Sequence, residues 1–183
     1  MTATPSTAPL TRIVVEVVGA PFHAIVTPED GTIRAGGFAT ADDPGALSLD
    51  ERLARLDPAL AARGVDPESR EDGPVAEALR AYAAGQLEAI DALTVVQPQT
   101  PFRGEVWRAL RRVHAGSAVT YTELAALAGR PSAVRAAASG CANNLVALVV
   151  PCHRIVRTDG GLGGYLFGTD IKERLLRHEG AEH

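Results

Sequence analysis

The residues best suited to chemistry lie in one stretch, Pro151-Cys152-His153-Arg154-Ile155-Val156. The thiolate is the nucleophilic form of cysteine, and neighbouring imidazole or guanidinium groups favour it. Cys152 is therefore a candidate nucleophile, with His153 and Arg154 as cationic neighbours. The alternative is a buried cysteine that only fills apolar space, which is a common place for a free cysteine.

The second cysteine, Cys141, has no His or Arg beside it, so we expect a structural role. Two cysteines in one region do not make a disulfide framework, which indicates a reducing compartment. Before residue 100 the chain has no cysteine and a single histidine, His23. We therefore predict no metal site.

The chain shows no signal for export or for membrane insertion. Its most apolar N-terminal stretch, Leu10 to Ala20, is interrupted by Arg12 and Glu16, unlike a signal peptide. The longest apolar runs are too short to span a bilayer. We expect a cytoplasmic protein that does not bind membranes.

The charges are divided unevenly between the two halves. Residues 1–99 carry seven Arg against fifteen Asp and Glu, whereas residues 100–183 carry eleven Arg and Lys against seven acids. A basic half joined to an acidic half is expected when one half meets a polyanion. Scattered, solvated charge explains the same numbers.

Several elements are predicted to position Cys152. The apolar run Leu145 to Val150 indicates a buried strand that ends at Pro151, because proline cannot donate to a sheet. A helix should begin after Thr100, with Pro101 in its first turn. Further on, Thr120 and Glu123 have capping-box spacing, and Ser132 should cap a helix to about Ser139. This helix pair fits a helix-turn-helix, but also an ordinary αα-corner.

The first half predicts a small antiparallel sheet. Strands are expected at Ile13–Val18, Phe22–Thr27 and Thr32–Phe38, with a turn at Gly19-Ala20-Pro21. Helices are expected over Asp50–Arg63 and from Pro74 to Gly85. The predicted class is α/β (α+β): residues 1–9 disordered, 10–99 an α/β domain with the sheet, and 100–183 a mostly helical domain with the helix-turn-helix and the strand that carries Cys152.

The Pro-Cys-His-Arg motif with two β-branched residues after it resembles the active-site signature of the O6-alkylguanine-DNA alkyltransferases. The resemblance runs from Thr100-Pro101-Phe102 through Val106-Trp107 to His178-Glu179-Gly180, which is nearly half the chain. Residues 1–99 resemble the family only loosely, through Leu79, Tyr82 and Gly85.

The resemblance implies catalytic roles. Cys152 would accept the alkyl group, and His153 would be its general base. Adjacent residues of an extended chain point apart, so the family's relay through a water, with Glu179 orienting the imidazole, fits better than direct contact. Asn144 would be the hinge before the Cys152 segment, although Leu145 stands where the family usually has proline. By residue type alone, Glu179 could be an exposed acid and Asn144 a turn residue.

It also implies a DNA-binding surface. Tyr121 would crowd the phosphate beside the target nucleotide, with Thr120 next to it. The Tyr121 hydroxyl would also have a catalytic role and help to protonate the leaving guanine. Arg135 would enter the base stack, and the small residues Ala136 and Ala138 would allow close approach in the minor groove. Arg135 could equally be a solvated surface residue. Extrusion of the base makes sense because the O6 atom is inaccessible to a thiolate inside the duplex.

The loop Gly160–Gly168 would close the guanine pocket. Leu166 and Phe167 replace the Ser-Gly that part of the family has after Tyr165, which puts the serine contact to guanine in doubt. The pocket residues implied by the resemblance are Tyr165, Leu166, Ala147 and Val156.

The implied function is repair: stoichiometric transfer of an alkyl group from O6-alkylguanine, and from O4-alkylthymine, in double-stranded DNA to Cys152. No cofactor is implied, because the damaged base is the donor, and we expect a monomer. A DNA-binding regulator of the alkylation response and a cysteine hydrolase remain alternatives. A lesion-binding protein without repair would lack the acceptor cysteine.

Overall fold

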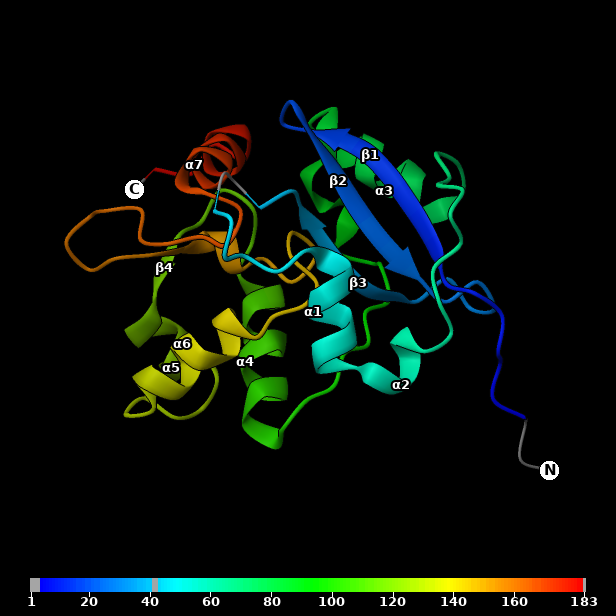
Figure 1. The fold of residues 1–183 in the computed structure, drawn as a ribbon. Coiled ribbons are helices and arrows are strands. Elements are labelled where there is room, and N and C mark those ends of the chain that lie inside the picture. Colours follow the sequence, from blue (N-terminus) through cyan, green and yellow to red (C-terminus); the bar gives the residue numbers. More distant parts are fainter. Residues whose placement is uncertain (1–3, 41–42, 183) are drawn as a thin grey trace.

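The computed structural model describes residues 4–40 and 43–182, and its mixed α/β architecture confirms the predicted fold class. The disorder predicted for residues 1–9 falls partly on residues 1–3, outside that range. In Figure 1 the sheet, with α3 (Pro74–Ala83) behind it, faces a group of helices, and α7 (Thr169–His178) lies near the C-terminus.

Three strands form the antiparallel sheet in the order β1 (Thr11–Val17), β2 (Ala20–Val26) and β3 (Ile33–Phe38). The turn between β1 and β2 is one residue earlier than predicted: Val18 and Gly19 both have positive φ, and Val17 pairs with Ala20. A two-residue turn of this kind matches the twist of the strands.

The predicted helix over Asp50–Arg63 is two helices, α1 (Leu49–Leu56) and α2 (Pro58–Ala61). Asp57 separates them, with φ −139° and its side chain accepting from the Leu60 N–H at 3.3 Å. The residue before a proline avoids the helical region, which explains the break. A one-turn helix, η1 (Leu87–Ile90), follows α3.

In the second half, α4 (Pro101–Arg112) begins after Thr100, and α5 (Tyr121–Leu127) begins with the predicted Thr120–Glu123 capping box. The next helix, α6 (Val134–Ala142), packs on both. It starts later than predicted: Ala133, not Ser132, precedes it, and no side chain caps it. Two short strands, β4 (Val119–Thr120) and β5 (Ile155–Val156), pair in parallel and bring the start of α5 beside the Cys152 segment.

Leu145 to Val150 does not form the predicted strand. Leu148 has φ +70°, and only Val146 forms a bridge, with Gly36 of β3. All six residues are buried, so the apolar run correctly predicted that the segment is buried, but wrongly predicted that its backbone forms a strand. Cys152 consequently opens a short 3₁₀ turn, η2 (Cys152–Arg154).

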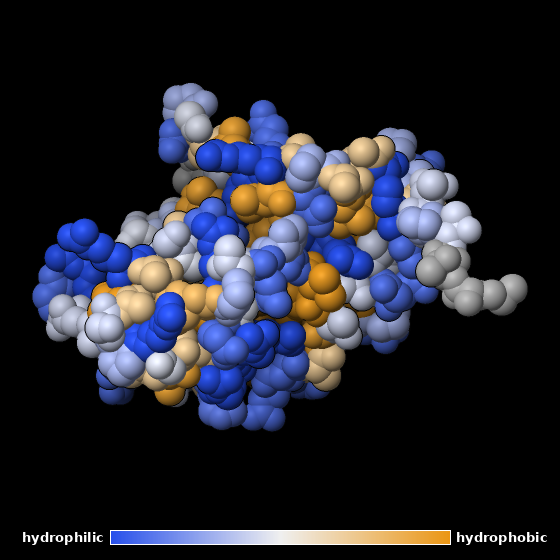
Figure 2. Space-filling view, turned by 90° about the horizontal axis from the view of Figure 1, so that it is seen from below, coloured by the Kyte–Doolittle hydropathy of each residue, from blue (hydrophilic) through white to orange (hydrophobic). Residues whose placement is uncertain are grey.

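The main hydrophobic core takes residues from both halves of the chain, including the inner face of β1, α3, α4 and the buried run before Cys152. A smaller cluster joins α1 to the other face of the sheet through Leu53, Ile25, Ala35 and Leu145. Seen from below, apolar side chains appear as separate patches among hydrophilic ones (Figure 2). Among the described residues, no helix combines the length and apolar character needed to cross a membrane.

Candidate functional site

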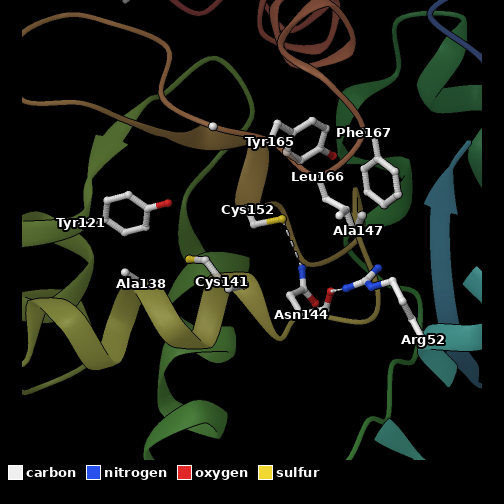
Figure 3. A pocket seen from close by; sticks show the side chains of 12 residues that line it. Arg52, Tyr121, Ala138, Cys141, Asn144, Ala147, Cys152, Tyr165, Leu166 and Phe167 are labelled. Atoms are coloured by element: carbon white, nitrogen blue, oxygen red, sulfur yellow. Dashed lines mark hydrogen bonds between the residues drawn. The ribbon is translucent and has the colours of Figure 1, made fainter. Parts of the chain in front are cut away.

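Cys152 lies in the wall of a cavity of about 310 Å³ between α6, the Cys152 segment and the loop around Tyr165. Figure 3 shows Asn144 between the Cys152 sulfur and the Arg52 side chain, and Nδ2 of Asn144 lies 3.4 Å from Sγ of Cys152. Three predicted pocket residues line this cavity, namely Tyr165, Leu166 and Ala147. The fourth, Val156, does not: it pairs with Thr120 in the short sheet and packs with Leu176 and Ala181.

Asn144 holds the segment that a strand was predicted to form. Its Oδ1 accepts from the Val146 N–H at 3.1 Å, and its Nδ2 donates to the Val150 carbonyl at 2.9 Å. Gln97 adds a second support, because its Nε2 donates to Asn144 Oδ1 at 3.0 Å and its Oε1 accepts from the Leu145 N–H at 2.8 Å. One buried amide thereby satisfies backbone groups that a neighbouring strand would otherwise satisfy.

His153 is fully buried beneath the cavity wall, and its Nε2 lies 2.8 Å from Oε1 of Glu179. Burial lowers the pKa of His153, and the hydrogen bond and charge of Glu179 only partly oppose this effect. Because a carboxylate can only accept, Nε2 carries the proton. The other nitrogen, Nδ1, is buried without a hydrogen-bond partner among the described residues, and is the basic atom of the ring.

Glu179 is only 5% exposed, which rules out the alternative that it is an ordinary acid on the surface. Burial works to raise its pKa, but hydrogen bonds from His153 and Arg154 outweigh burial and hold the pKa well below the usual range. Arg154 grips both carboxylate oxygens, with Nε to Oε2 at 3.0 Å and Nη2 to Oε1 at 2.9 Å. Arg154 therefore pairs with the Glu179 carboxylate. Its place in the motif had indicated a cationic neighbour of the Cys152 thiol instead. Tyr82 donates a further hydrogen bond to Oε1 at 2.8 Å.

Two cations influence the thiol, and neither was predicted from the sequence. Burial raises the pKa of Cys152, while the Asn144 hydrogen bond and the charges of Lys172 and Arg52 act in the opposite direction. Lys172 is buried and donates to the carbonyls of Ile155 at 2.5 Å and Gly164 at 3.3 Å. It is the only lysine of the chain, a signal that could have drawn attention to it.

The predicted DNA-binding residues lie on α5 and α6. Tyr121 opens α5 and lines the cavity together with Ala138 of α6. Thr120 uses its side chain as the cap of α5, accepting from the Glu123 N–H at 3.2 Å. Arg135 and Ala136 are exposed on α6. Gly164 and Phe167, from the loop expected to close the pocket, also line the cavity, and so do Arg52, Cys141 and Ala142, which the sequence did not indicate.

Residues 101–181 match the family model for the DNA-binding domain of 6-O-methylguanine DNA methyltransferase. A methylated-DNA–protein-cysteine methyltransferase of Salmonella typhimurium is 45% identical over 108 residues, covering 59% of this chain and 63% of that protein. One from Methanosarcina barkeri is 42% identical over 104 residues, covering 57% of this chain and 65% of the relative. These alignments span less than two thirds of the relatives' length.

Solved structures extend the likeness in fold to nearly the whole chain. The O6-methylguanine methyltransferase of Mycobacterium tuberculosis has a TM-score of 0.70 at 24% identity, covering 93% of each chain. That of the archaeon Pyrococcus kodakaraensis has a TM-score of 0.60 at 27% identity, covering 94% of this chain and 99% of the other. The resemblance to the O6-alkylguanine-DNA alkyltransferases thus covers residues 101–181 in sequence and nearly the whole chain in fold.

Proposed function

We propose that this protein repairs DNA by moving an alkyl group from O6 of guanine, or from O4 of thymine, onto Cys152. The observation that carries the proposal is the thiol in a cavity wall, followed in the chain by His153, whose ring is paired with the buried Glu179 carboxylate. The names of the relatives support this activity.

The proposed chemistry follows from the placement of the groups. His153 Nδ1 is the free acceptor, so it can take the thiol proton through a bridging water, while Glu179 stabilises the imidazolium that forms. The thiolate then attacks the alkyl carbon, an S–C bond forms, and the C–O6 bond breaks. Its electron pair leaves with the guanine, which is protonated. The thioether has no electrophilic carbonyl for water to attack, so each chain should act once.

DNA would bind across α5 and α6. Tyr121 lies in the cavity wall, where it can crowd the phosphate beside an extruded base, and exposed Arg135 can fill the gap in the stack from the minor groove. Ala136 and Ala138 present small side chains to the backbone of the DNA. We further propose that the protein acts as a cytoplasmic monomer without a cofactor.

The two cysteines of the cavity supply a matched test. The protein is mixed with excess O6-methylguanine DNA, and the methyl groups per chain and their position are measured by mass spectrometry. We expect one methyl on Cys152 in the wild type and in Cys141→Ala. Burial raises the pKa of both thiols, but only Cys152 has the opposing Asn144 hydrogen bond and a histidine beside it in the chain. Cys152→Ala should bind the lesion and remove nothing.

Four outcomes would count against the proposal. Demethylation by Cys152→Ala would show that another group accepts the alkyl group. More than one methyl removed per chain would reject the single-turnover mechanism. Lesion binding by the wild type without transfer would favour the DNA-binding regulator, and turnover of a simple ester would favour the hydrolase.

A further inference from the structure

Arg52 brings a buried positive charge from α1 into the wall of the thiol cavity. The residue is 8% exposed, and its Nη2 donates to the backbone carbonyl of Asn144 at 2.9 Å. Its Nη1 is buried without a hydrogen-bond partner, and no carboxylate of the described residues forms an ion pair with it. Burial is the main effect on the Arg52 pKa and lowers it, as expected for a cation without a paired anion.

A buried arginine without a paired anion lowers the stability of the folded protein. Much of the nearby wall is apolar and includes Ala147, Leu166 and Phe167, which suit a hydrocarbon group. A guanidinium has five N–H donors in a planar fork that matches a carboxylate. A methyl or other neutral alkyl group in this cavity would leave the Arg52 guanidinium without an anionic partner.

Arg52 and the reactive sulfur are joined by one residue. Asn144 contacts Sγ of Cys152 through its side chain and Nη2 of Arg52 through its carbonyl. Figure 3 shows Cys152 and Arg52 approaching Asn144 from different sides, with Ala147 and Leu166 above the space between them. A group whose first carbon meets the sulfur can therefore extend its far end toward the guanidinium.

We propose that Arg52 makes this cavity a site for alkyl groups that carry a carboxylate, of which O6-carboxymethylguanine is the smallest. The inference rests on the proposed function and specifies its substrate class. The Cys152 thiolate attacks the methylene carbon, the S–C bond forms, and the C–O6 bond breaks with its electron pair leaving on guanine, which takes up a proton. The product is S-carboxymethyl-Cys152, whose carboxylate stays beside Arg52.

A different role for Arg52 would be support of the thiolate or of Asn144 for every substrate. The two roles differ in what they predict. Support of the thiolate changes transfer of all alkyl groups by the same factor, whereas binding of the carboxylate changes only the charged group. The test therefore compares substrates within each variant.

Three duplex oligonucleotides of one sequence carry O6-carboxymethyl-, O6-carbamoylmethyl- or O6-methylguanine, and single-turnover rates are measured at low substrate concentration. The carbamoylmethyl group has the same shape without the charge, and its carbon is the more electrophilic of the two, so faster transfer of the carboxymethyl group would reflect binding of its charge. Because hydrogen bonds to charged groups are the stronger ones, the wild type should transfer the carboxymethyl group roughly 10- to 100-fold faster than its amide. A ratio of one or less overturns the proposal.

Arg52→Met should reduce this ratio to about one, and Arg52→Lys should retain part of it, because lysine keeps the charge without the fork. Arg55→Met, an exposed arginine on the same helix, is the matched control and should keep the wild-type ratio. An unchanged ratio in Arg52→Met overturns the proposal. If that variant does not fold, Arg52→Lys and the wild-type ratio decide. A wild type that transfers none of the three groups rejects the proposed repair function itself.

Discussion

One carboxylate oxygen, Oε1 of Glu179, accepts hydrogen bonds from His153, Arg154 and Tyr82. These donors come from η2 and from α3, so a residue near the C-terminus is fixed by both halves of the chain. A fixed carboxylate keeps the proton of His153 on Nε2 and leaves Nδ1 as the base. The position of the proposed base therefore depends on Glu179, Arg154 and Tyr82, which do not line the cavity.

Removal of the Tyr82 hydroxyl tests this dependence. Tyr82→Phe should lower the free energy of unfolding by about 1–3 kcal/mol, because a hydrogen bond to a buried carboxylate is lost. The rate of methyl transfer should fall several-fold, since Glu179 is then held by two residues. Tyr165→Phe is the control for stability: the Tyr165 hydroxyl is buried without a hydrogen-bond partner among the described residues, so its removal should cost little. Equal destabilisation in both variants would contradict the role given to Tyr82.

The pH dependence of stability follows from His153 and Glu179. Both have a lower pKa in the folded protein than their ordinary values of 6.5 and 4.5. The unfolded chain therefore binds more protons below these values, and stability must fall as the pH drops through each of them. We expect denaturant unfolding to give a constant free energy between about pH 7 and 8 and a decline from about pH 6.5 downward.

Two histidine variants show how much of this decline in the free energy of unfolding is due to His153. His153→Gln should remove much of the part between about pH 6.5 and 5 and leave the contribution of His23, whose pKa burial also lowers. His114→Gln, at an exposed position, should leave the decline unchanged. A decline that survives in full in His153→Gln would show that other groups cause it.

The motif around Cys152 was enough to propose Cys152, His153 and Glu179 from the sequence, because their neighbours in the chain carry the signal. Arg52 and Gln97 carried no such signal, and Tyr82 stood out only through the loose resemblance of residues 1–99. They contact Asn144 or Glu179 across 92, 47 and 97 positions of the chain. A contact of this kind depends on how the halves pack and not on any local spacing.

At the scale of elements, the helices and the sheet followed from caps and alternation, while the segment Leu145–Val150 did not. A run of apolar residues indicates burial and leaves strand and turn undecided. Here Leu148 takes a left-handed conformation that is unusual for its type, and Asn144 supplies the missing hydrogen bonds. The edge of β3 holds the start of this segment: Gly36 N–H donates to the Leu145 carbonyl at 2.9 Å, and Ala147 N–H to the Gly36 carbonyl at 3.0 Å.

The next residue of β3, Gly37, sets the position of the cavity loop. A Cβ at Gly37 would lie 2.6 Å from Cζ of Phe167, so the phenyl ring must shift. Gly37→Ala should destabilise the protein by about 1–3 kcal/mol through overpacking, although alanine is otherwise the better strand residue. The ratio of O6-benzyl- to O6-methylguanine transfer should change as well.

A smaller side chain at residue 167 should relieve the clash. Thermal and denaturant unfolding of Gly37→Ala, Phe167→Leu and the double variant forms a cycle, and we expect the double variant to be more stable than the sum of the single effects. Additive effects would show that Gly37 and Phe167 do not oppose each other.

For the whole molecule, the central question is whether residues 101–181, the part that matches the family model, form a folding unit. The predicted boundary at residue 100 remains a prediction, and the packing shows strong dependence across it. The main core mixes side chains such as Val15, Leu79 and Phe22 with Val106, Val146 and Leu175. Arg52, Tyr82 and Gln97 complete the hydrogen bonds of Asn144 and Glu179 from the other side of the boundary.

We therefore expect a fragment of residues 100–183 to lack cooperative unfolding. Without residues 1–99, the fragment would expose the apolar surface that packs on the sheet, and Glu179 and Asn144 would lose buried partners, each loss costing about 1–3 kcal/mol. These losses approach the total stability of a domain, which is about 5–15 kcal/mol. Thermal melting by circular dichroism and hydrogen exchange of the fragment, beside the full chain, measure the effect. Addition of a separate 1–99 fragment should restore both folding and methyl transfer. A fragment that melts cooperatively and transfers methyl at the full-length rate would show that the first half of the chain does not support the site.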